Sequence, residues 1–111
     1  MRTYDEFHGR VPQKDIGKRL REIVKVEKKS FKIVTGYGSS SLRSQSKNAA
    51  LSSLRRMVEE GIIVAYLPGE IKHEILKSNS SYFAYKIKYE ARIKNDIDYG
   101  NDGIIFIFVA D

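Results

Sequence analysis

A carboxylate and an imidazole stand two residues apart near the start of the chain, in the segment Glu6-Phe7-His8-Gly9. We expect a short strand over residues 2–7, and side chains two positions apart on a strand point to the same face. Glu6 would then orient the ring of His8 or stabilise its protonated form, as a general acid or base requires. A lone histidine at a strand end usually has no chemical role, so the pair needs support from elsewhere in the chain.

A second group of residues able to do chemistry follows the next predicted strand, in the Gly- and Ser-rich run 36–41. Backbone N–H groups of such a loop, with the N-terminus of the helix behind it, can hold a phosphate. The run matches neither a dinucleotide-binding fingerprint nor a Walker A loop, and a tight turn that simply requires glycine is the alternative. We expect a phosphate of nucleic acid as the ligand. The residues predicted to bind it are Thr35, Gly36, Tyr37, Gly38, Ser39, Ser40, Arg43 and Lys47.

Several other chemistries are excluded by the residues present. The chain has no Cys, so disulfides and thiolate metal sites cannot form. His73-Glu74 begins like the zinc-protease motif, but Lys77 stands where that motif needs its second histidine. The serines at 39–41 lack the Gly-x-Ser-x-Gly sequence of a nucleophile elbow. We therefore expect no metal and no cofactor.

The spacing of apolar residues predicts the elements that position these groups. Helical spacing predicts one helix over residues 13–27 and another over 44–60. Strict alternation of apolar and charged residues predicts a strand with one solvated face over residues 82–94. The remaining predicted elements are strands over 2–7, 31–34, 62–66 and 104–109 and a short helix within 70–77.

This order of elements predicts an α/β fold in a single domain over residues 1–111. We expect a two-layer sandwich in which a mixed sheet of four to five strands carries two main helices on one face. Its core is strand–helix–strand–helix–strand, and residues 70–97 form an insert that contributes the extra strand.

The net charge of +6 is concentrated in the first half of the chain. Residues 1–60 contain fourteen Lys and Arg against seven Asp and Glu, whereas residues 61–111 contain six against seven. An excess of positive charge beside a phosphate site favours nucleic acid as the partner, although basic residues also cover ordinary solvent-exposed helix faces. No apolar run approaches the roughly 20 residues that span a bilayer, and the N-terminus lacks the apolar core of a signal peptide. We therefore expect a cytoplasmic domain with no membrane partner.

A third glycine-containing segment, Tyr99-Gly100-Asn101-Asp102-Gly103, precedes the apolar run 104–109. Together with Glu6-Phe7-His8-Gly9 and Thr35-Gly36-Tyr37-Gly38, it resembles the motifs of the Smr (small MutS-related) domain. That family has Asp-x-His-Gly before its first helix, His-Gly-x-Gly before its second, and a glycine-rich turn before its last strand. The resemblance covers nearly the whole chain except residues 70–97.

The resemblance implies binding of nucleic acid and, in several family members, nicking or cleavage of DNA or RNA. His8 matches the histidine of the first motif and Glu6 replaces its aspartate, whereas Thr35 replaces the histidine of the second motif. One hypothesis is a metal-independent nuclease in which His8 is the general acid or base, Glu6 orients it and the glycine loop holds the scissile phosphate. The alternative is a module without catalysis that binds DNA, RNA or a ribosomal site. A binder of small phosphorylated molecules is a third possibility.

Overall fold

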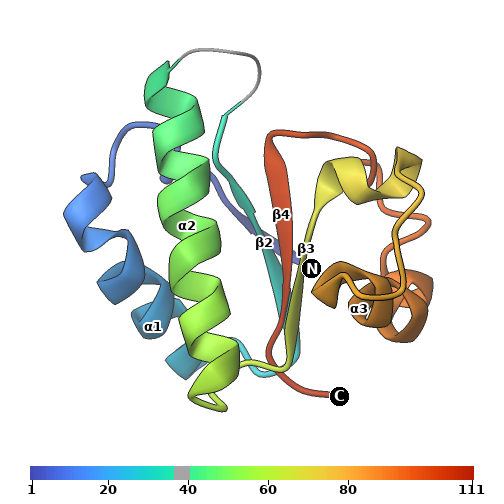
Figure 1. Cartoon of the computed structure of the whole chain (residues 1–111). Helices are drawn as coiled ribbons and strands as arrows, with labels where there is room; N and C mark the ends of the chain where they lie inside the picture. Colours follow the sequence, from blue (N-terminus) through green and yellow to red (C-terminus); the bar gives the residue numbers. More distant parts are fainter. Residues whose placement is uncertain (37–40) are drawn as a thin grey trace.

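A computed structural model of the chain describes residues 1–36 and 41–111, leaving out the side chains of residues 41–44. The strands of this described part are β1 (Arg2–Tyr4), β2 (Ser30–Val34), β3 (Ala65–Pro68) and β4 (Ile104–Phe108). Its α-helices are α1 (Ile16–Val26), α2 (Ser41–Glu59) and α3 (Ser81–Tyr89) (Figure 1). Short 3-10 turns are η1 (Gln13–Asp15), η2 (Gly69–His73) and η3 (Glu90–Arg92).

The strands form one mixed sheet in the order β1-β2-β4-β3, which confirms the predicted α/β fold. β1 pairs with β2 in parallel and places Tyr4 opposite Ile33. β4 is antiparallel to both of its neighbours, so that Ile105 lies opposite Ile33 of β2 and Pro68 of β3. Every residue of β4 is buried, because side chains on both faces of this central strand are covered. The continuous apolar run 104–109 is therefore a core strand, as predicted.

One face of the sheet packs against α1 and α2, which lie on the same side in Figure 1. From the sheet, alternate residues of β2 and β4 reach this core. From the helices, the predicted apolar stripes reach it, together with Phe7 from the chain between β1 and η1. The buried residues of this core include Phe7, Ile16, Leu20, Ile23, Phe31, Ile33, Ala50, Leu54, Met57, Ile105 and Ile107.

The other face of β3 and β4 is covered by the segment predicted as an insert. Leu67 of β3 and Phe106 and Phe108 of β4 share a second buried cluster with Ile71 of η2 and Tyr89 of α3. The rings of Tyr89 and Phe108 stack with centroids 4.8 Å apart. The sandwich predicted with two layers thus has a third, partial layer built by the insert (Figure 1).

The predicted strand over residues 82–94 is wrong, because this segment forms α3 and then η3. Ser80 caps the helix, since its hydroxyl oxygen accepts a hydrogen bond of 3.2 Å from the backbone N–H of Tyr82. Tyr82, Tyr85 and Tyr89 are spaced three and four residues apart and share one helical face. Ile87, which strict alternation would bury, is 71% exposed. The segment therefore has both the two-residue alternation of a strand and the three- and four-residue spacing of a helix, and it folds as a helix.

Several other predicted boundaries also differ from the structure. The first strand ends at Tyr4 rather than at residue 7. The third begins at Ala65 rather than at residue 62, because α2 is followed by a turn at Gly61, whose φ is 75°. In that turn the backbone N–H of Ile62 still donates to the carbonyl of Met57, at 2.9 Å. The helix predicted within 70–77 is the shorter turn η2.

A buried lysine ties the insert to the sheet. Lys32 of β2 points away from α1 and α2, and its side chain is only 9% exposed. Its ammonium donates to both carboxylate oxygens of Asp96, at 2.8 and 3.0 Å, and lies 2.8 Å from an oxygen of Asp98. Burial acts to lower the pKa of Lys32, but the two carboxylates outweigh it and the pKa is raised. Burial likewise acts to raise the pKa of Asp96, but hydrogen bonds from Lys32 and from the backbone of Asp98 lower it.

Candidate nucleic-acid interface

The connections that follow β1, β2 and β3 meet at one edge of the sheet. These three strands run in the same direction, because β1 is parallel to β2 and β4 is antiparallel to both β2 and β3. Their carboxyl ends therefore share an edge, which is the upper one in Figure 1. In open α/β sheets, ligands commonly bind outside the carboxyl ends of the strands. Each described residue of the predicted site belongs to or lies near these connections: Glu6, His8, Thr35, Gly36 and Lys47.

The connection after β1 contains a tight turn over residues 6–10. The carbonyl of Glu6 accepts hydrogen bonds from the backbone N–H groups of Arg10, at 3.2 Å, and Val11, at 3.1 Å. The turn buries Phe7 completely and leaves His8 exposed to solvent. Gly9 adopts a φ of 139°, which other residues rarely reach. The expectation that Glu6 and His8 share one face of a strand is therefore wrong, because the strand has already ended.

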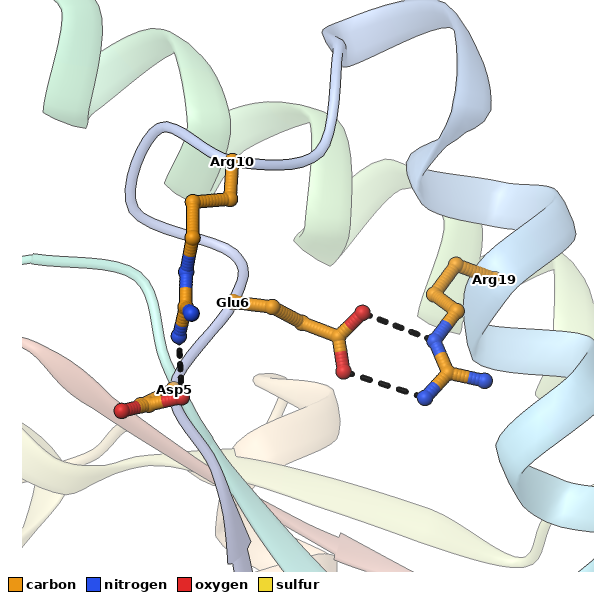
Figure 2. A network of polar contacts seen from close by, with 4 residues as sticks. All are labelled: Asp5, Glu6, Arg10 and Arg19. Carbon is orange, nitrogen blue, oxygen red and sulfur yellow. Dashed lines mark hydrogen bonds and ion pairs between the residues drawn. The ribbon is translucent and has the colours of Figure 1, made fainter.

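The carboxylate of Glu6 is bound by Arg19 of α1 (Figure 2). The two guanidinium N–H groups of Arg19 donate to its two oxygens, at 2.8 and 3.1 Å. This hydrogen bond to Glu6 raises the pKa of Arg19 above its ordinary value. Within the described residues, neither oxygen of Glu6 is hydrogen-bonded to His8. Glu6 thus anchors the turn to α1, and Asp5 pairs with Arg10 beside it.

The first residue after β2 is hydrogen-bonded to the residue that precedes β4. Thr35 is completely buried, and its backbone N–H donates to the carbonyl of Gly103 at 2.8 Å. Its hydroxyl donates to the same carbonyl at 3.4 Å. Gly36 has a φ of 103°, so a glycine is required at this bend. The other predicted loop residues, Tyr37, Gly38, Ser39 and Ser40, and the side chain of Arg43 lie outside the described part of the chain.

Lys47 of α2 makes an ion pair that the sequence did not indicate. Its ammonium contacts a carboxylate oxygen of Glu70 in η2 and donates to the carbonyl of Asp102 at 3.0 Å. The second oxygen of Glu70 is buried and accepts no hydrogen bond from the described residues. Lys47 therefore links α2 to η2, which follows β3, and to the connection before β4. A phosphate would have to compete with Glu70 for it. Residues 23 positions apart carry no local signal of such pairing.

A hollow joins the turn after β1 to the first half of α2. Its volume is about 250 Å³, and Gly9 lies on one side of it and Ser46 of α2 on the other. The side chains of Gln13 and Gln45 bridge the same two segments through a hydrogen bond of 2.7 Å. The chain at Gly9 is open, because a Cβ there would meet no atom within 4 Å. The full lining is Gly9, Val11, Pro12, Gln13 and Ser46.

The positive charge near this hollow is carried by lysines rather than by arginines. Each arginine from Arg2 to Arg21 lies within 3.6 Å of a carboxylate oxygen. Lys14 of η1 and Lys18 of α1 make no ion pair with the described residues. Lys14 directly follows Gln13, which lines the hollow, and Lys18 lies four residues further along the chain. They are therefore available to an anionic ligand.

Comparison of the chain with protein-family models, with curated proteins and with solved structures gave no match. Over the described residues, no three His, Cys, Asp or Glu side chains come together as a metal site would require. Likewise, none of the described helices combines the length and the apolarity needed to cross a membrane.

Proposed function

We propose that this chain is a nucleic-acid-binding domain of the Smr kind, which binds the sugar-phosphate backbone of DNA or RNA at the carboxyl edge of its sheet. The observation that carries the proposal is the hollow between Gly9 and Ser46. It joins Gly9 of the first motif to α2, the helix that follows the second motif. Lys14, which makes no ion pair with the described residues, directly follows Gln13 of its lining. Open backbone at glycines and lysine ammonium groups are suited to phosphate oxygens. A cytoplasmic location belongs to the same proposal, because a chain without cysteine needs no oxidising compartment.

Cleavage by His8 is a second candidate function, favoured by the exposure of this imidazole at the same edge. On RNA, His8 would remove the proton of a 2′-hydroxyl that attacks the neighbouring phosphorus, or protonate the departing oxygen. Glu6 would take no direct part, because Arg19 occupies both of its oxygens. Its contribution would be to hold the turn that presents His8.

Binding to nucleic acid should weaken steeply with salt, because phosphate contacts release condensed counterions. We expect Lys14→Gln and Lys18→Gln each to reduce the slope of log K against log[salt] by about 1. The measurement is fluorescence anisotropy with a labelled RNA and a labelled DNA duplex at several salt concentrations. Lys28→Gln is the matched control, since Lys28 is exposed beside the amino end of β2, at the opposite edge of the sheet. An affinity independent of salt, or equal effects at all three lysines, would contradict the proposed surface.

His8→Ala should separate cleavage from binding. If His8 is the general acid or base, the variant should cut labelled RNA or DNA about 10² to 10⁴ times more slowly while binding it with unchanged affinity. The fold should be unaffected, because His8 is exposed. Glu6→Gln is the companion variant and should retain most of the cleavage rate. Intact substrate with both the wild type and His8→Ala would leave binding as the function and remove catalysis from it.

A further inference from the structure

A second hollow lies between α2 and α3, next to the edge strand β3. Its volume is about 260 Å³. Four of its lining residues come from successive turns of α2, and a tyrosine comes from each of β3 and α3. The lining residues are Asn48, Leu51, Ser52, Arg55, Tyr66 and Tyr82. Positions 48, 52 and 55 share one face of α2, so an amide, a hydroxyl and a guanidinium face the two tyrosines.

The aromatic side of this hollow is held by edge-to-face packing. The rings of Tyr66 and Tyr82 are nearly perpendicular, at 88°, with centroids 5.6 Å apart. Tyr85, one turn further along α3, also packs against Tyr66, and the centroids of these two rings are 5.8 Å apart. Burial raises the pKa of Tyr82 well above its ordinary value, so its hydroxyl stays neutral at physiological pH. The hollow therefore has an uncharged aromatic wall whose rings have little freedom to move.

The opposite side of the hollow is polar and solvated. Asn48 and Arg55 are both exposed, and Arg55 makes no ion pair with any described carboxylate. Burial raises the pKa of Tyr66, and the positive charge of Arg55 acts against this rise. A guanidinium, an amide and an aromatic ring in one hollow correspond to the phosphate, the polar edge and the face of a nucleotide.

We propose that this hollow binds one unpaired base of a single-stranded nucleic acid. The base stacks on Tyr82, the amide of Asn48 hydrogen-bonds its edge, and Arg55 binds the adjacent phosphate. This assignment rests on the proposed function, and it specifies single-stranded nucleic acid as the preferred ligand. Lys47 precedes Asn48 at the carboxyl edge of the sheet, and Arg55 lies about 12 Å further along α2. A strand bound at that edge can therefore continue into the hollow, whereas the bases of a duplex are paired and stacked.

The test compares Asn48→Ala, Arg55→Ala and the double variant with the wild type, using fluorescence anisotropy. The probes are a labelled single-stranded decamer, an abasic decamer of the same length and a duplex of the same sequence. Arg56→Ala is the matched control, because it removes the same charge from the neighbouring position of α2, outside the hollow. Both replaced side chains are exposed, so the variants should fold as the wild type does. Tyr82→Phe, which keeps the ring, should bind like the wild type.

We expect the double variant to bind the base-containing single strand about tenfold more weakly than Arg56→Ala does. We also expect it to lose the wild type's preference for that strand over the abasic one. Affinity for the duplex should change no more than in the control. If Arg55→Ala and Arg56→Ala behave alike on all three probes while the wild type still binds them, the base site is refuted and the proposed function stands. If the wild type binds none of the probes, the proposed function fails and the base site with it.

Discussion

Lys32→Met should lower the free energy of unfolding by about 3 kcal/mol. The substitution leaves the carboxylates of Asp96 and Asp98, which are 16% and 27% exposed, without the ammonium that both contact. Removing one partner of a largely buried ion pair is costly because the remaining charge stays partly desolvated. Urea denaturation followed by circular dichroism would measure the change. Lys88→Met is the matched control and should cost far less, because Lys88 and Asp111 form an ion pair in which both side chains are more than 60% exposed.

Adding Asp96→Asn and Asp98→Asn to Lys32→Met should restore much of the lost stability, because no unpaired charge then remains. The pH dependence gives a second check. The pKa of Asp96 is lowered by folding, so its contribution is present above about pH 4 and is lost as the pH falls through its folded pKa. The pKa of Lys32 is raised, so its contribution is present below about pH 10.5 and is lost as the pH rises above that value. The difference between the wild type and Lys32→Met should therefore shrink in acid, and a gap that stays constant down to pH 2 would contradict this account.

Gly69→Ala should destabilise the protein by about 3 kcal/mol, at the upper end of the usual cost of overpacking. A Cβ at this position would lie 2.0 Å from the carbonyl oxygen of Asn101, a backbone atom that no side-chain rotation can move aside. The carbonyl of Gly69 also accepts a hydrogen bond of 2.9 Å from the backbone N–H of Gly100. The methyl group would therefore push η2 away from the connection before β4. Thermal and urea unfolding would measure the loss.

Gly17→Ala is the matched control for this prediction. There the new Cβ would meet the hydroxyl oxygen of Ser53 at 2.9 Å, and a serine hydroxyl can rotate away. The gain in helix propensity, about 1 kcal/mol, should offset the adjustment, so that stability stays within about 1 kcal/mol of the wild type. Equal stability of Gly69→Ala and Gly17→Ala would show that the backbone before β4, at Asn101, shifts at little cost in free energy to make room for the methyl group. In that case Lys47 would not depend on a fixed η2 for its contacts with Glu70 and Asp102.

Part of the candidate site could be predicted from the sequence, and part of it could not. The placement of His8 and Gly36 at one edge follows from strand order and could be anticipated from the alternation of strands and helices. The partner of Glu6 could not, because Arg19 is thirteen residues away and belongs to a different element. The sequence-based role of Glu6 assumed that the strand continued to residue 7, whereas the strand ends at Tyr4 and a turn over residues 6–10 buries Phe7. A short polar strand contains no apolar pattern that marks where it ends.

The secondary structure of residues 82–94, within the insert, could not be predicted from the local sequence either. Residues 82–94 alternate apolar and charged side chains, yet three of their tyrosines also share one helical face. Local sequence cannot choose between two periods that are both present. The choice is made by Phe106 and Phe108 of β4, which need cover on the second face of the sheet and receive it from Tyr89 and Ile93.

By itself, the sequence determined which segments have a buried side. The stripe of Ile16, Leu20 and Ile23 and the apolar run of β4 are buried wherever their partners lie, because burial of apolar surface depends on local spacing. Only the tertiary structure decided the pairings of charged groups: Lys32 with Asp96, Glu6 with Arg19 and Lys47 with Glu70. Such pairs form between residues far apart in the chain, and each charged side chain had several oppositely charged candidates. The packing of helices and strands brings one of these candidates within reach of each charged side chain. The residues that neighbour it in the sequence do not indicate which candidate that is.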